Sequence, residues 1–95
     1  MKKNTTENIA SMALYEKIIS FDNVEDCYRF FQDLCSVTEL RSIEQRYDVA
    51  KLLHEGKVYT EIVEKTGASS ATISRVNRAL KYGESGLMDV FQQEK

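Results

Sequence analysis

Apolar residues recur at helical spacing along most of the chain, and short polar or glycine-containing segments separate the helical stretches. The clearest stripe along one helical face is formed by Val24, Cys27, Tyr28, Phe31, Leu34 and Cys35. Phe30 lies beside this stripe, so the helix has apolar side chains on more than one side. A chain of 95 residues has few other side chains with which to cover both sides of this helix. The pattern therefore favours a second chain as the cover.

The segment before that stripe is expected to be helical from Ile9 to about Ser20. Residues 1–8 are polar and show no periodicity, and we expect them to be disordered. Asp22 or Asn23 then caps the striped helix, because short polar side chains accept hydrogen bonds from the free N–H groups of a first helical turn. Either residue fits this role.

A third helix is expected to begin at Val37, because Ser36 and Glu39 have the spacing of a capping box, in which each side chain bonds the backbone N–H of the other. Its apolar face is formed by Leu40, Ile43, Tyr47, Ala50 and Leu53. Gly56 ends the helix. Together with the two helices before it, this helix forms a dimerisation region that we assign to residues 9–56.

Residues 59–81 have the pattern of two short helices joined by a tight turn. Gly67 supplies the turn, because glycine adopts positive φ at no steric cost. Ser69 can cap the second helix, with Thr72 three residues further on. The core that the two helices share is expected to consist of Val63, Gly67, Ile73 and Val76. After a glycine-containing break, the last apolar positions predict a short helix over residues 86–94.

In the second helix of the pair over residues 59–81, apolar and basic positions lie on different sides. Ile73, Val76 and Leu80 recur at helical spacing. The positions that face elsewhere are small or basic: Ser70, Ala71, Ser74, Arg75, Arg78 and Lys81. Small residues let a helix approach base edges closely and basic residues contact phosphates, which predicts a helix-turn-helix that enters a DNA major groove. The alternative is a solvated amphipathic helix whose basic C-terminal side chains favour the helix dipole.

Charge is distributed unevenly along the chain. The whole sequence has a formal net charge of −2. Residues 57–82 carry five basic side chains and two carboxylates, so this segment has a charge of +3 and the remainder has −5. A basic surface on an acidic body directs DNA to one side of a protein, so overall acidity does not exclude nucleic-acid binding.

The sequence contains no arrangement typical of an enzyme or a metal site. It has no glycine-rich phosphate loop and no cluster of histidines and cysteines with ligand spacing, so we expect no catalytic residue, metal or cofactor. Cys27 and Cys35 are eight positions apart in one expected helix, about 12 Å along its axis, which is too far for a disulfide and favours buried reduced thiols. His54 falls in the last turn of a helix, where a positive charge or a plain surface contact is common.

No apolar run approaches the roughly 20 residues needed to cross a bilayer. The first ten residues, MKKNTTENIA, lack the apolar segment of a secretory signal. We therefore expect a cytoplasmic protein with no membrane partner, and a single helical domain over residues 1–95.

The segment from Ser36 to Lys81 resembles the Trp repressor superfamily, and within it the Trp-repressor-related YerC group. The matching positions are Leu52, Leu53, Gly56, Gly67, Ala68, Ala71, Thr72, Ile73, Arg75, Leu80 and Lys81. The resemblance implies an all-α fold with six helices, a helix-turn-helix and an intertwined homodimer. It also implies that Ser70, Ala71 and Ser74 lie where the family contacts base edges.

The same resemblance implies an effector pocket at Arg46 and Arg75, which match the arginines that hold the amino-acid corepressor in the Trp repressor. Two neighbouring positions depart from that pattern. Val76 replaces a glycine that leaves room for the indole ring, and Ala79 replaces a serine that binds the amino group of the ligand. We therefore expect Val76 to fill the space as part of the core, and we expect no tryptophan binding.

The sequence thus predicts a homodimeric, sequence-specific transcription regulator that binds double-stranded DNA. The family resemblance implies that it is a repressor. The expected DNA-binding residues are Lys65, Gly67, Ser69, Ser70, Ala71, Thr72, Ser74, Arg75, Arg78 and Lys81. One alternative is a helical protein–protein interaction module. Another is a metabolite-responsive regulator that binds an anionic ligand through Arg46 and Arg75. The competing interpretation of Arg46 is a surface ion pair with Glu44 or Asp48.

Overall fold

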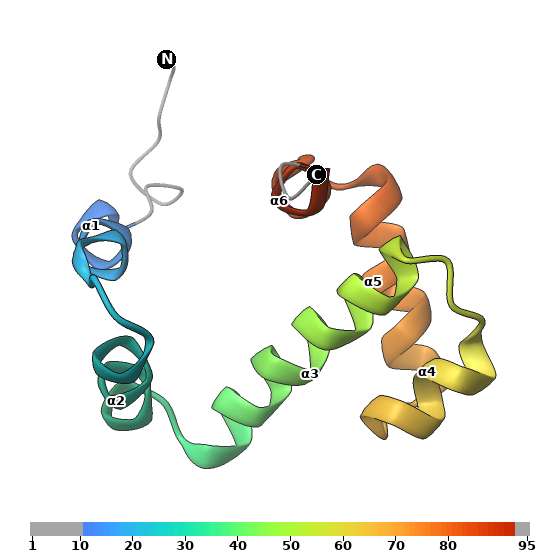
Figure 1. Cartoon of the computed structure of the whole chain (residues 1–95), viewed down its shortest axis with the longest axis horizontal. Coiled ribbons are helices and arrows are strands. Elements are labelled where there is room, and N and C mark those ends of the chain that lie inside the picture. Colours follow the sequence, from blue (N-terminus) through green and yellow to red (C-terminus); the bar gives the residue numbers. More distant parts are fainter. Residues whose placement is uncertain (1–10, 93–95) are drawn as a thin grey trace. The chain divides into compact units, whose positions relative to one another are not determined.

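The computed structural model describes residues 11–92, which form helices joined by short connections and contain no strand (Figure 1). The helices are α1 (Met12–Ser20), α2 (Val24–Leu34), α3 (Val37–His54), α4 (Tyr59–Thr66), α5 (Ser70–Tyr82) and α6 (Gly86–Gln92). The chain divides between Ser36 and Val37 into two compact units. The expected all-α class is confirmed, and none of the helices in residues 11–92 is long and apolar enough to cross a membrane.

The first unit contains α1 and α2. Asn23 is the residue that caps α2, since its side chain accepts a hydrogen bond of 2.8 Å from the backbone N–H of Asp26. The helix expected from Ile9 begins at Met12 in the described residues, and Ser11 is its N-cap. The expectations for residues 1–10 lie outside the described part of the chain. Neither α1 nor α2 contains a fully buried residue.

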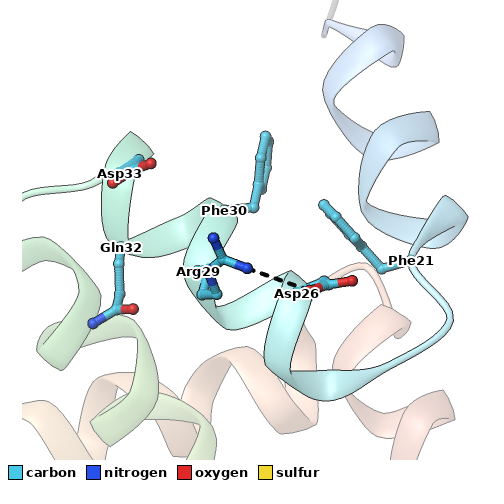
Figure 2. Close-up of a pocket in the computed structure, with 6 residues that line it drawn as sticks. All are labelled: Phe21, Asp26, Arg29, Phe30, Gln32 and Asp33. Atoms are coloured by element: carbon cyan, nitrogen blue, oxygen red, sulfur yellow. Dashed lines mark ion pairs between the residues drawn. The ribbon is translucent and has the colours of Figure 1, made fainter.

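Phe30 has an aromatic neighbour within this first unit. Its ring packs against Phe21, which precedes α2, with the ring centroids 5.4 Å apart. Figure 2 shows the two rings beside an open depression whose other lining residues are polar: Asp26, Arg29, Gln32 and Asp33. The stripe itself remains open, because Val24 is 85% exposed and Leu34 is 55% exposed. Both ends of the stripe are therefore exposed in this chain.

The second unit, α3 to α6, has a continuous apolar core. In this unit α3 contacts each of the other three helices, and α5 contacts α4 and α6 (Figure 1). The buried side chains are Val49, Ala50, Ile62, Ala68, Ile73, Val76, Leu80 and Phe91. All four helices contribute to this core, so the position of α5 is fixed by packing on its neighbours.

Two expectations about buried faces were only partly right. Ile62 is fully buried in the core between α4 and α5, whereas the expected Val63 is 41% exposed. On α3, Ala50 of the expected face is buried, but Ile43 and Tyr47 are 46% and 43% exposed and the neighbouring Val49 is fully buried. Neighbouring residues point about 100° apart around a helix, so an error of one position selects another face. Each helix has apolar residues on both faces, and only packing decides which one is covered.

The last helix is fixed by an aromatic contact. The Phe91 ring lies 5.5 Å from the Tyr47 ring and 5.5 Å from the His54 imidazole, to which it is nearly parallel at 22°. His54, which is exposed, therefore makes a plain surface contact, one of the two roles expected of it. Before α6, Gly83 ends α5 at a position where a Cβ atom would lie 2.5 Å from the Ala79 carbonyl oxygen. This break turns the chain so that α6 packs on α3.

Candidate functional site

The connection between α4 and α5 is a tight turn with satisfied backbone groups. Gly67 follows α4 with a φ of +74°, and its N–H donates to the Val63 carbonyl over 2.8 Å. Ser69 caps α5, because its hydroxyl accepts a hydrogen bond of 3.1 Å from the Thr72 N–H. The expected roles of Gly67 as pivot and Ser69 as cap are confirmed. The helix itself begins one residue later, at Ser70.

The two sides of α5 differ sharply in chemistry. Ile73, Val76 and Leu80 are buried against the other helices of the unit, as expected. Among the exposed residues of the remaining surface are Ser70, Ala71, Ser74, Arg75, Arg78 and Lys81. No carboxylate of residues 11–92 forms an ion pair with any of these three basic side chains. We call this exposed set the basic face of α5.

The other expected contact residues lie next to the basic face, and their side chains already have local partners. The Lys65 ammonium forms an exposed ion pair of 3.3 Å with Glu61, one turn earlier on α4. The hydroxyls of Ser69 and Thr72 are 3.1 Å apart within the helix cap. Exposed ion pairs contribute only about 0–1 kcal/mol, so Lys65 can exchange this partner for another anion.

A cavity of about 480 Å³ lies between α3, α5 and α6. The structure brings together the four residues expected there, Arg46, Arg75, Val76 and Ala79, and adds Ile43, Tyr47 and Leu87 to the lining. Val76 is 4% exposed and belongs to the core, as expected. A cavity remains beside it, so Val76 does not fill the whole space as expected.

Arg46 forms no ion pair with Glu44 or Asp48 within residues 11–92, which contradicts the alternative that placed it in a surface pair. Both carboxylates are two positions away on the same helix, and residues at that spacing do not face each other. The arginine instead lines the cavity beside Arg75. Both guanidinium groups are therefore available to an anion.

Sequence reasoning missed several residues of this region. Tyr47 was assigned to an apolar stripe, and nothing in that pattern indicated that it would line a cavity with Leu87. Gln45 was not singled out, although its side-chain amide donates a hydrogen bond of 3.1 Å to the Thr66 carbonyl. A single glutamine on a helix gives no signal of such a contact in a sequence.

Cys27 and Cys35 are free thiols, as expected, but both are only half-buried in this chain.

The Trp repressor protein family model matches residues 10–95, which is nearly the whole chain. The chain belongs to the Trp repressor family. It is 53% identical over 70 residues to the uncharacterized protein YerC of Bacillus subtilis (strain 168), a match that covers 74% of this chain and 67% of YerC. The all-α, six-helix arrangement is therefore a Trp-repressor-like fold.

Two crystal structures support the same assignment. A TrpR-like protein from Eubacterium eligens ATCC 27750 superposes with a TM-score of 0.81 and 48% identity, over 86% of this chain and 84% of that chain. A protein from Staphylococcus aureus described as a candidate Trp repressor superposes with a TM-score of 0.83 and 38% identity, over 97% and 95%. At the level of the Trp repressor family, these similarities indicate a DNA-binding regulator.

Proposed function

We propose that the protein is a homodimeric, sequence-specific transcription regulator, and by family habit a repressor, whose α4 and α5 form a DNA-binding helix-turn-helix. The observation that carries the proposal is the basic face of α5. Its apolar side is anchored in the core, and its exposed cations have no carboxylate partner among residues 11–92. A rigid helix with small residues at one end and cations along it suits the major groove of DNA.

The residues of the basic face divide into two roles. Ser70, Ala71 and Ser74 lie near the N-terminus of α5 and would approach base edges. Their short side chains favour contact with thymine methyl groups or water bridges over bidentate readout. The cations further along, Arg75, Arg78 and Lys81, would contact phosphates, with Lys65 able to join them. Specificity then comes from the first group and most of the affinity from the second.

A second copy of the chain would cover the apolar surface of α1 and α2. Side chains of this unit that remain well exposed are Met12, Tyr15, Ile19, Val24, Tyr28 and Leu34. An apolar surface of this kind marks an interface in a folded protein. A two-fold dimer would place its two α5 helices in successive major grooves, about 34 Å apart, so the operator should be nearly palindromic.

The experiment that tests the proposal combines a mobility shift with light scattering. We expect the protein to scatter as a dimer and to retard random duplex DNA, with retention falling steeply between about 50 and 200 mM salt. A protein–protein interaction module would show no such salt-dependent binding. A dimer that retards no duplex at the lowest salt would contradict the DNA-binding proposal and favour that alternative.

The cavity at Arg46 and Arg75 favours a second, compatible activity: binding of a small anionic effector. Its two guanidinium groups stand beside apolar side chains, which suits a carboxylate or phosphate with an apolar portion. Tryptophan should not bind, because Val76 narrows the place that a glycine leaves open for the indole ring, and Ala79 lacks the hydroxyl that would hold the amino group. Titration calorimetry with millimolar tryptophan should give no saturable heat. Clear saturation would contradict this exclusion.

A further inference from the structure

The turn before α5 is tied to α3 by a side chain that the proposed function does not use. The Gln45 amide on α3 donates from Nε2 to the backbone oxygen of Thr66, the last residue of α4, over 3.1 Å. The two residues are 21 positions apart, and the bond is partly buried. Carbonyl groups at the end of a helix have no partner inside that helix. Gln45 therefore supplies a partner from another helix.

Thr66 is itself the centre of the hydrogen bonds that shape this turn. Its hydroxyl donates to the Ile62 carbonyl over 2.7 Å and accepts from the Ala68 N–H over 3.1 Å. Ile62 and Ala68 are both core residues, at 0% and 2% exposed. A shift of Thr66 would therefore move Ala68 and the residue that follows it, the helix cap Ser69.

The short side chains near the start of α5 depend most on this arrangement. Ser70 and Ala71 can approach a base only as far as the backbone allows, because neither has a long side chain to make up for a displacement. Arg78 and Lys81 can follow a phosphate, because their side chains are long and flexible. A small displacement of the turn should therefore weaken base contacts while leaving phosphate contacts in place.

We propose that Gln45 is a positioning residue for sequence recognition, which holds Thr66 and thereby fixes the start of α5 relative to α3. This role rests on the proposed DNA binding. It assigns to α3 a direct part in specificity, through a hydrogen bond and without contact to DNA. Loss of the bond should lower affinity for the specific site more than affinity for unrelated DNA.

The first test compares Gln45→Leu with wild-type protein on two duplexes. One is the duplex that wild-type protein selects from a random pool, and the other has the same bases in shuffled order. Leucine has a similar size but cannot donate a hydrogen bond. We expect about a tenfold loss of affinity for the selected duplex and at most about a twofold loss for the shuffled one. The matched control is Gln92→Leu, an exposed residue at the end of α6, which should change neither affinity.

The second test uses no DNA. Amide hydrogen exchange at Ala68 and Thr72 should become faster in Gln45→Leu, while exchange in α6 stays unchanged. Gln45→Glu, which also cannot donate at neutral pH, should show the same changes and serves as the second variant if the leucine variant does not fold.

The outcomes of the two tests separate this role from the proposed function. If Gln45→Leu lost affinity equally for the selected and the shuffled duplex, or lost none, the positioning role of Gln45 would be overturned and DNA binding would stand. Unchanged exchange at Ala68 and Thr72 would show that Gln45 does not hold the turn, and would overturn it as well. If wild-type protein selected no duplex, the proposed function would fail, and the recognition role of Gln45 with it.

Discussion

The two units of this chain use their apolar residues in opposite ways. The unit that ends at Ser36 contains the clearest helical stripe in the sequence, yet neither of its helices has a fully buried side chain. The unit that begins at Val37 has less regular patterns and contains all the buried apolar side chains of residues 11–92. A regular stripe thus does not show that the same chain will bury it. We propose that α3–α6 fold within one chain and that α1–α2 pair two chains.

The largest effect should come from the core of the second unit. Ile62→Ala removes a fully buried side chain, so we expect a loss of about 2–5 kcal/mol in the free energy of unfolding. Val63→Ala is the matched control on the same helix, and its 41% exposure predicts a loss below about 1 kcal/mol. Urea unfolding at one fixed protein concentration measures both variants. Equal losses would contradict the assignment of Ile62 to the core.

The next effect should separate pairing from folding. Val24→Ser combined with Leu34→Ser removes two exposed apolar side chains of the α2 stripe. If a second chain covers them, the dimer dissociation constant should rise by at least about tenfold. Sedimentation equilibrium measures this constant, and Glu25→Ser on the same helix is the control that should leave it unchanged. A double variant that dimerises like wild type would place the interface elsewhere.

The smallest effect should come from the basic face of α5. Arg78→Ala should weaken binding to every duplex several-fold and reduce the slope of log affinity against log salt by about one, without changing stability. The control is Lys17→Ala on α1, which lies outside the basic face. Affinity measured at three or more salt concentrations gives the slope. Unchanged affinity and slope would remove Arg78 from the DNA-binding residues.

Local signals in the sequence predicted most of the helix boundaries. The first residues of α3 and α6, and the break after Tyr82, followed from capping residues, glycines and apolar spacing. Burial was harder to predict where both faces of a helix carry apolar residues. Ile62 and Val63 are both β-branched and apolar, and only the packing of α4 on α3 and α5 selects the first of them.

The candidate site was predictable in the same uneven way. The basic face of α5 followed from residue types on a single helix. Arg46, Arg75, Val76 and Ala79 of the cavity were expected from the family resemblance. Ile43, Tyr47 and Leu87 were not, because no local pattern relates the residues of α3 to those of α6. The bond from Gln45 to Thr66 joins residues on different helices, and helical spacing relates only residues of one helix. Long-range contacts of this kind need coordinates.

The central claim is that two chains, joined through α1 and α2, present two copies of α5 to one DNA duplex. Sedimentation velocity of the protein mixed with a duplex selected from a random pool measures this directly. The account predicts a complex with the mass of one duplex and two chains, on a nearly palindromic site whose half-sites lie about 10 base pairs apart. A complex with one chain per duplex, or free duplex alone at low ionic strength, would contradict it.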